Sequence, residues 1–425
     1  MLLNEPLYYY ELIQQRYKNS YLAEDKTQSI IGIDCDYIDE KERSFDELRA
    51  YFNCNISYEA PFAGLFGVFA YEGINFYEDI NLNNNKQYDF PKFFYANAKA
   101  YLHYDKVSKI YTFYGDRDKY YEMLKTDELE KKDDSEKWYE ILTNLNEEKE
   151  HFKHIVTVSK EYVAKGDVFQ VVVSEQLKLR TNLSSLHFYK ALTKLNPSPY
   201  MFHFPTPYGD VVGSSPELVF EMRDDKIFVA PIAGTRSRGI DANADEILKN
   251  ELLSDEKELA EHKMLIDLAR NDIGHVSKPR SVVVKNAMHI QMYQSVMHIV
   301  SDVYGVRDSQ NDAFDVLGAI FPAGTLSGTP KIRAMQIIAE LEKFKRNIYG
   351  GGIGFLHFNG DVQMAILIRS AIFVTNSSEN DVFIQSGAGI VYDSIAENEY
   401  AEICHKRGSV MRVFMDNCKN LNNIR

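Results

Sequence analysis

Residues 353–374, IGFLHFNGDVQMAILIRSAIFV, consist of two apolar runs on either side of the dipeptide Asn359-Gly360. Asn-Gly is a strong signal for a tight hairpin, because both residues readily adopt the positive φ angles that a type I′ turn requires. The flanking runs, at residues 353–358 and 363–374, are rich in residues that favour strands. We therefore expect two antiparallel strands here.

Similar runs recur along the chain and predict further strands joined by short turns. Segments with helical periodicity lie between them, and this mixture indicates an α+β fold. The further strands are expected at residues 66–71, 169–176, 296–303 and 382–391.

Three helices are expected in the second half of the chain. One starts after Ser254 as N-cap, with Asp255 and Glu256 favourable to the helix dipole, and runs to Gly274. Another covers residues 397–414, and a third starts at Pro330, because proline suits the first helical position. The third helix is expected to turn inward Ile332, Met335, Ile338 and Leu341.

Composition points to a large globular protein. The chain has 425 residues, of which 45% are hydrophobic and only 12 are proline. The 62 acidic against 48 basic residues give a formal charge of −14, which disfavours nucleic acid and anionic membrane surfaces as partners. An anionic substrate would therefore need local cations.

The cysteines and the N-terminus indicate a cytoplasmic protein. Four cysteines without a CxxC pair argue against a disulfide framework and a zinc site. Residues 1–10 lack the pattern of a signal peptide, and no run approaches the roughly 18 apolar residues of a membrane span.

One strongly charged stretch, residues 125–137, reads as a solvated connector. Residues 1–140 before and around it contain little that looks catalytic, and are expected to contribute strands to the same fold. Residues 141–425 are expected to form the catalytic region.

Two helix faces carry carboxylates. Glu258 and Glu261 are three apart, and Glu399, Glu402 and Lys406 share a face at i, i+3 and i+7. Two such faces could close on Mg²⁺, which prefers oxygen ligands and retains several waters. From spacing alone, solvated surface glutamates are the more common interpretation.

Glycine-rich turns are further candidates, because backbone without a Cβ can approach a carboxylate closely. None fits a nucleotide-binding motif, and each glycine could instead serve a bend or a bulge. His298 shares a strand face with Val296 and Val300, as a hydrogen-bonded core residue or as a proton carrier. The turns lie at residues 233–235, 323–328, 350–352 and 387–389.

Taken in order, these segments resemble the chorismate-utilising enzymes, a family that contains anthranilate, aminodeoxychorismate, isochorismate and salicylate synthases. The resemblance is strong over residues 150–410 and weak over the first 140. It implies a four-layer α/β/β/α fold with two packed antiparallel sheets. The matching motifs lie at residues 166–174, 215–217, 231–236, 258–272, 321–331, 349–351, 368–370, 387–391 and 399–406.

The resemblance also implies the layout of the site. Glu261 and Glu402 would contact Mg²⁺, with Glu258 and Glu399 supporting it through water, and Glu217 would be the general acid that protonates the departing 4-hydroxyl of chorismate. The carboxylates of the substrate would be received by Tyr349, Arg369, Gly389 and Lys406. The pocket would be completed by Gly234, Thr235, Thr325, Gly387 and Ala388.

Two positions separate the branches of the family. Water-using members carry a lysine base where this chain has Gln170, and aminodeoxychorismate synthases commonly carry a nucleophilic lysine where it has Ala233. The resemblance therefore implies ammonia as nucleophile, with His298 promoting loss of pyruvate to give anthranilate. An aminodeoxychorismate synthase component and a non-catalytic relative that binds chorismate or tryptophan are the alternatives.

Two partners follow from the same resemblance. Nothing here matches the G-x-C-x-G turn of a glutamine amidotransferase, so ammonia would come from a separate amidotransferase subunit. Tryptophan would be a feedback inhibitor, although Asp25 replaces the serine of the family and would either bond its amino group or repel its carboxylate. The inhibitor site would include Leu22, Glu24, Asp25, Pro199, Tyr200 and Met201.

Overall fold

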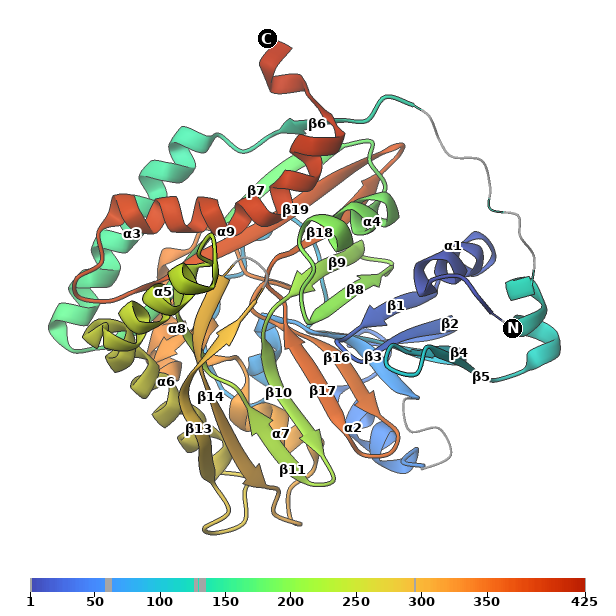
Figure 1. The fold of residues 1–425 in the computed structure, drawn as a ribbon, viewed down its shortest axis with the longest axis horizontal. Helices are drawn as coiled ribbons and strands as arrows, with labels where there is room; N and C mark the ends of the chain where they lie inside the picture. Colours follow the sequence, from blue (N-terminus) through green and yellow to red (C-terminus); the bar gives the residue numbers. More distant parts are fainter. Residues whose placement is uncertain (1, 58–62, 126–128, 130–134, 294–295, 425) are drawn as a thin grey trace.

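The computed structural model describes residues 2–57, 63–125, 129, 135–293 and 296–424 (Figure 1). Its strands form one ladder that folds over on itself, antiparallel throughout except where β20 (Lys419–Asn420) pairs with β6. One half of the ladder contains, in spatial order, β13 (Val283–Met292), β14 (Val296–Val306), β11 (Lys226–Val229), β10 (Leu218–Arg223), β17 (Val362–Ile366), β16 (Gly352–His357), β3 (Gly64–Phe69) and β4 (Phe93–Asp105).

The other half of the ladder continues from β4. It contains β2 (Gln28–Asp39), β1 (Tyr21–Glu24), β8 (Tyr200–Phe204), β9 (Asp210–Ser215), β18 (Ser370–Asn376), β19 (Glu379–Ile390), β7 (Gln170–Thr181) and β6 (Trp138–Ile141). Three further strands pair with β14, β4 and β7: β12 (Ile232–Ser237), β5 (Ile110–Tyr114) and β15 (Gly328–Thr329).

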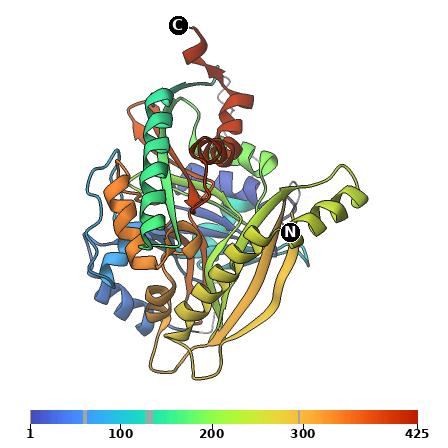
Figure 2. The ribbon, with the colours of Figure 1, turned by 90° about the vertical axis from the view of Figure 1, so that its left-hand side faces the viewer.

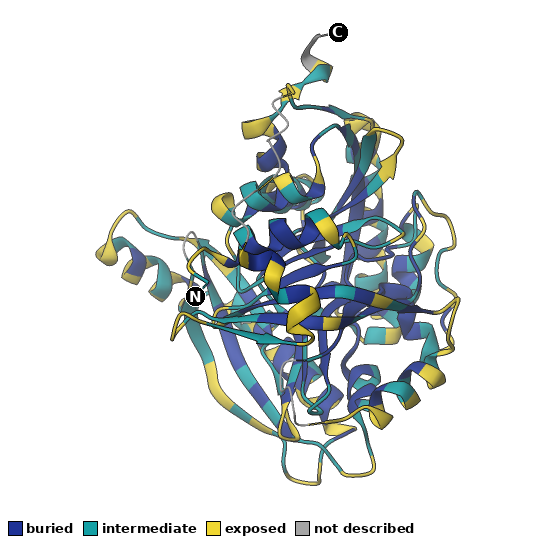
Figure 3. Ribbon diagram, turned by 90° about the vertical axis from the view of Figure 1, so that its right-hand side faces the viewer, coloured by how far each residue is buried: buried dark blue, intermediate teal, exposed yellow. Residues whose placement is uncertain are grey.

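The two halves pack face to face through aromatic side chains. Tyr21 stacks on Phe66 with ring centroids 4.4 Å apart, and Phe66 also meets Phe204 and Phe355. All four side chains are buried in one hydrophobic cluster, which contains residues of both halves. The strands accordingly appear buried in the middle of the molecule in Figure 3, with exposed residues on helix surfaces and loop tips.

Helices cover the outer faces of both halves. The first half is covered by α2 (Phe45–Cys54), α6 (Glu256–Gly274) and α7 (Ala313–Ile320). The second half is covered by α1 (Pro6–Arg16), α4 (Ser185–Leu195) and α9 (Ala396–Asn417), with α3 (Leu145–Lys165) and α8 (Lys331–Leu341) against β7 and β19. The layers are therefore helix, sheet, sheet and helix, and the expected α+β fold is confirmed (Figure 2).

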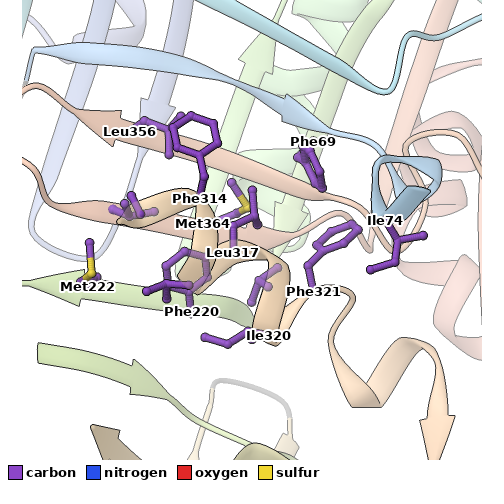
Figure 4. Packing of buried hydrophobic residues seen from close by; sticks show 14 of the residues in the cluster. Phe69, Ile74, Phe220, Met222, Phe314, Leu317, Ile320, Phe321, Leu356 and Met364 are labelled. Atoms are coloured by element: carbon purple, nitrogen blue, oxygen red, sulfur yellow. The ribbon is translucent and has the colours of Figure 1, made fainter. Parts of the chain in front are cut away.

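Aliphatic and aromatic packing fixes α7 on the first half. Leu317 and Ile320 of this helix, with Phe321 after it, lie against Phe220 and Met364 (Figure 4). Burial of such side chains stabilises a fold by about 25 cal/mol for each Å² of apolar surface removed from water. The turn that follows α7 is thereby held beside the sheet.

The N-terminal residues complete the ladder. Strand β1 pairs with β8, where Leu22 lies opposite His203, and β3 pairs with β16, where Phe66 lies opposite Phe355. Most of the charged stretch expected as a connector, residues 126–128 and 130–134, lies outside the described residues.

Three expected strands were wrong in their extent. The run at residues 363–374 is broken between β17 and β18, where Arg369 has a φ of 51° in the left-handed region. Phe169 precedes β7 with 70% of its surface exposed, and β3 ends at Phe69 because a 3₁₀ helix (Tyr71–Phe76) follows. An apolar run alone does not reveal where the ladder of hydrogen bonds stops.

Two helix details were also wrong. The N-cap of α6 is Asp255, whose carboxylate accepts from the backbone N–H groups of Lys257 and Glu258, while Ser254 ends the preceding α5 (Ala242–Ser254). In α8, Met335 and Ile338 are buried as expected, but Ile332 is 36% exposed. Its buried face is centred instead on residues 334–338, which pack on β7. Among the described residues, no helix is long and apolar enough to cross a membrane.

Candidate active site

Glu217 occupies the turn between β9 and β10, at the edge where the sheet halves diverge. Burial raises the pKa of its carboxyl to about 7, and the positive charges of Lys406 and Arg369 act against that shift. Its Oε1 accepts a hydrogen bond of 2.8 Å from the hydroxyl of Thr325, in the 3₁₀ turn Gly324–Leu326. Near neutral pH this carboxyl can therefore carry a proton and donate it.

His298 projects from β14 next to β12. Its Nδ1 lies 3.0 Å from the carbonyl oxygen of Gly234 and 3.0 Å from the hydroxyl of Thr235. A carbonyl can only accept, so Nδ1 carries the proton and Nε2 is left free to act as a base. Burial lowers the pKa of the imidazole, aided by the charges of Arg369 and Lys406, and keeps the ring neutral.

A φ of 63° at Gly234 makes this arrangement possible. The glycine sits at an irregularity in the pairing of β12 with β14, between Ala233 and Thr235. A left-handed φ is strained for residues with a side chain, and a Cβ here would lie 3.1 Å from a carboxylate oxygen of Glu258. The carbonyl oxygen of Gly234 is thereby directed toward His298, and the carboxylate of Glu258 on α6 can lie close to the glycine.

Two cations, Lys406 and Arg369, act electrostatically on Glu217. Lys406 of α9 donates to the carbonyl oxygen of Gly387 at 3.0 Å and pairs with Glu402 at 2.6 Å. Arg369 has no ion-pair partner within the part of the chain that the structure describes, and burial lowers the pKa of its guanidinium. Tyr349, whose pKa burial raises to about 12, interacts with it electrostatically. A half-buried guanidinium without an ion-pair partner, acting on Glu217 together with a lysine, suits an anionic ligand.

Gln170 and two glycines form the floor of the site. Gln170 is only 4% exposed and donates through Nε2 to Oε1 of Glu261 at 2.7 Å. A Cβ at Gly389 would lie 2.5 Å from that same nitrogen, and one at Gly387 would lie 2.9 Å from the hydroxyl of Tyr349. A side chain at either position of β19 would therefore clash with its neighbours.

Ala388, between these glycines, points the other way. It is fully buried in the cluster formed with α3 and α8. Its side chain anchors the strand, so its part in the expected substrate pocket can only come from its backbone.

Carboxylates of α6 and α9 face one another across the site. Burial raises the pKa of Glu261, with added repulsion from Glu258 and Glu402, and burial likewise raises that of Glu399, with repulsion from Glu402. Like charges brought together in this way are stabilised by a cation, and hard oxygen donors fit Mg²⁺. Across the described ranges, no three Asp, Glu, His or Cys side chains converge closely enough to hold an ion alone. The donor set fits an ion that takes few protein ligands.

A buried arginine that the sequence did not single out supports the site. Arg346 is 1% exposed, pairs with Glu342 and donates to the carbonyl oxygens of Leu326 and Val172, each at 2.6 Å. It thereby ties the turn of Thr325 to strand β7. No motif surrounds it, so only the buried contacts reveal its role.

The expected inhibitor residues gather around a second cavity, about 30 Å³ in volume, between the sheet halves. Glu24, Asp25, Tyr200 and Met201 line it, whereas Leu22 packs into the hydrophobic cluster on the helix-covered face. The lining does not include Pro199.

Both acidic residues of this cavity have partners inside the protein. Asp25 accepts from the backbone N–H groups of Thr27 and Gln28 at 2.7 and 2.9 Å, and Glu24 accepts from Ser29 and Tyr189 at 2.7 and 2.6 Å. Asp25 therefore closes the turn between β1 and β2, a role that its place in the sequence did not suggest.

Comparison with known proteins assigns the chain to a family. A family model described as chorismate binding enzyme matches residues 5–412. The chain belongs to this family. The resemblance noted from the sequence motifs is thereby confirmed.

Relatives in the chorismate-binding family include proteins named anthranilate synthase component 1. That of Methanothermobacter marburgensis is 38% identical over 373 residues, which cover 88% of this chain and 79% of the relative. That of Aquifex aeolicus (strain VF5) is 49% identical over 284 residues, 67% of this chain. The alignment spans 56% of the length of the Aquifex protein.

Solved structures of the family share the fold. Anthranilate synthase component I from Streptococcus pneumoniae TIGR4 superposes with a TM-score of 0.75 at 31% identity, covering 92% of this chain and 90% of that one. The menaquinone-specific isochorismate synthase MenF of Escherichia coli gives 0.75 at 17% identity, over 97% of this chain and 91% of that one. The second match shows the fold alone, so only site residues distinguish the reactions within it.

Proposed function

We propose that this chain converts chorismate and ammonia to anthranilate and pyruvate in the cytoplasm, with Mg²⁺ as cofactor and a glutamine amidotransferase subunit as the source of ammonia. The observation that carries the choice of reaction is Gln170. Its amide is buried against Glu261 on the floor of the site, where a base would have to stand to activate water. A neutral amide cannot take a proton, so the nucleophile must be one that needs no activation.

Glu217 is suited to the first step. With a pKa of about 7 it is half protonated at neutral pH, so it can give its proton to the 4-hydroxyl of chorismate, which leaves as water while ammonia adds at C2. Thr325 holds the carboxyl by a 2.8 Å hydrogen bond. Arg369 and Lys406 supply the positive charge that a dianionic substrate requires in a chain of net charge −14.

His298 is suited to the second step. Its free Nε2 can take the proton from C2 of the aminated ring as the enolpyruvyl group leaves, and the ring becomes aromatic. The carbonyl of Gly234 fixes the required tautomer through Nδ1. The lowered pKa leaves the imidazole in the basic form at neutral pH.

Glu261 and Glu402 would hold Mg²⁺, with Glu258 and Glu399 behind them, and the bound ion would neutralise the ring carboxylate of the substrate. In support of this assignment, burial raises the pKa of Glu261 and Glu399, and repulsion from neighbouring carboxylates adds to the rise. Gln170 orients Glu261 toward the site through its 2.7 Å hydrogen bond.

Tryptophan is proposed as an inhibitor at the cavity between β1, β8 and β16. Because about 30 Å³ accommodates little more than water, the cavity must widen for an indole to enter. Asp25 and Glu24 already serve internal partners, so tryptophan would compete with Thr27 and Ser29 for them. Calorimetric titration with tryptophan, using Glu24→Gln as the variant, tests this point.

The reaction is tested by fluorescence at the emission of anthranilate, with purified chain, chorismate, Mg²⁺ and ammonium at mildly alkaline pH. A signal that requires both Mg²⁺ and ammonium is the expected result. Consumption of chorismate without ammonium would point to a water-using reaction and would contradict the meaning assigned to Gln170.

A further inference from the structure

Tyr293 contacts the imidazole of His298 edge to face. The centroids of the two rings are 5.6 Å apart, and the ring planes are inclined at 67°. Aromatic rings attract one another at this separation and angle. The contact therefore favours one orientation of the imidazole over others.

The register of the two strands that carry these side chains brings them together. Gln291 of β13 lies directly opposite His298 of β14. Tyr293 comes two residues later, so its side chain points to the same face and lies diagonally from His298, within reach of an aromatic ring. The N–H of Tyr293 donates to the carbonyl oxygen of Val296 at 2.8 Å, which continues the pairing of the strands to this residue.

The backbone of Tyr293 is also held by residues outside these two strands. Nη1 of Arg238 donates to its carbonyl oxygen at 2.7 Å. The guanidinium pairs with Asp245 of α5 at 2.5 Å, and that carboxylate accepts from the N–H of Gly239 at 2.7 Å. The ring of Tyr293 is thus attached to a fixed point, from which it can hold a neighbouring side chain in place.

The phenol of Tyr293 belongs to the reaction site and not to the core. Burial raises its pKa and the charge of Glu217 adds to the rise, so the phenol is neutral near pH 7. Among the described residues, the hydrophobic clusters do not include Tyr293. Its ring therefore contributes to the surroundings of Glu217 and His298 without being needed for core packing.

The hydrogen bonds of His298 leave one freedom that a ring contact can remove. Nδ1 lies 3.0 Å from both the carbonyl oxygen of Gly234 and the hydroxyl of Thr235, which fixes the tautomer. Bonds to that single nitrogen still allow the ring to tilt and to shift Nε2. A displacement of about 1 Å at a reacting group can lower a rate by a factor of about 100.

We propose that Tyr293 is a positioning residue for the second step, and that its ring holds the His298 imidazole where Nε2 removes the proton from C2. The C2–H electron pair then forms a ring double bond as the C3–O bond to the enolpyruvyl group breaks. The inference rests on the proposed function, because it concerns the base of that reaction. Protonation of the leaving hydroxyl by Glu217 does not use this imidazole and should be little affected.

The test separates the two steps in single-turnover reactions of Tyr293→Ala and Tyr293→Phe. Enzyme in excess over chorismate is mixed with Mg²⁺ and ammonium and quenched at intervals, and chromatography separates chorismate, the aminated intermediate and anthranilate. Loss of chorismate reports the first step and decay of the intermediate reports the second. Both rates come from one reaction, so a smaller active fraction does not alter their ratio.

Tyr304→Ala is the matched control. Tyr304 lies on the same face of β14, six residues beyond His298, and its ring lies against Phe228 with centroids 4.9 Å apart. Tyr293→Leu keeps the bulk of the side chain without its ring and takes the place of the alanine variant if urea unfolding shows that the latter does not fold.

Tyr293→Ala, or the leucine variant, should slow decay of the intermediate about tenfold and change the loss of chorismate by less than about twofold. Tyr293→Phe keeps the ring and should leave both rates within about twofold of the unmodified chain, as should Tyr304→Ala. Equal slowing of both steps, no slowing of the second, or a phenylalanine variant as slow as alanine would overturn the positioning role. Absence of ammonium-dependent anthranilate from the unmodified chain would instead refute the proposed function.

Discussion

Replacing Glu217 by glutamine should abolish turnover and, at alkaline pH, make the protein more stable. Burial raises the pKa of this carboxyl from 4.5 to about 7. The folded state therefore binds the proton more tightly than the unfolded state does. The stability that comes from this proton is present below pH 4.5 and is lost as pH rises through about 7.

The magnitude follows from the shift. A rise of about 2.5 pKa units at about 1.36 kcal/mol for each unit gives about 3 kcal/mol. Glutamine has nearly the same shape, cannot ionise and can still accept the hydrogen bond from Thr325. The free energy of unfolding of Glu217→Gln should thus exceed that of the unmodified chain by about 3 kcal/mol at pH 8 and differ little near pH 5.

Urea unfolding of both proteins at pH 5 and pH 8 measures this difference, and anthranilate fluorescence measures the loss of activity. Glu161→Gln, on the exposed surface of α3, is the matched control and should show no such pH-dependent gain. A difference between Glu217→Gln and the unmodified chain that is the same at both pH values would refute the reasoning, because it would mean that Glu217 is not buried as a charge in the folded state.

His298→Ala should let an aminated, non-aromatic intermediate accumulate, detected by chromatography of the reaction mixture; equal loss of both steps would contradict its assignment. Glu261→Gln should abolish Mg²⁺-dependent turnover with little change in melting temperature, since it removes one of several repelling carboxylates; activity that persists without metal would count against the site. Arg346→Met should cost about 3–5 kcal/mol in urea unfolding, because Glu342 would remain as a buried, unpaired charge; a cost below about 1 kcal/mol would show that water replaces the arginine.

The sequence determined the elements of the fold because hydrophobic periodicity and turn residues act locally. The hairpin at Asn359-Gly360 joins β16 to β17 as expected, and the long helices α6 and α9 lie where periodicity placed them. The ends of the strands and helices were harder to predict from the sequence. Arg369 breaks an apolar run with a left-handed φ, and Asp255 displaces Ser254 as N-cap, because both depend on hydrogen bonds that the run of residue types does not encode.

Motif order was enough to name the residues of the candidate site, and family membership confirmed the resemblance on which those names rested. Motif order could not show the environment of those residues. Whether Glu217 carries a proton near pH 7 depends on its burial among residues about a hundred positions away, such as Thr325. The sequence likewise left open whether Asp25 would attract or repel an inhibitor. The structure shows that its carboxylate accepts a hydrogen bond from the backbone N–H of Thr27.

What the sequence by itself determined, then, is the set of chemical groups and the strands and helices that carry them. Only the tertiary structure decided that Leu22 packs with the helices and not along the cavity beside Tyr200, and that Arg346 ties Leu326 to Val172. The physical reason is that pKa values, buried ion pairs and cavities arise from contacts between residues distant in the chain, and such contacts leave no periodic pattern in the sequence.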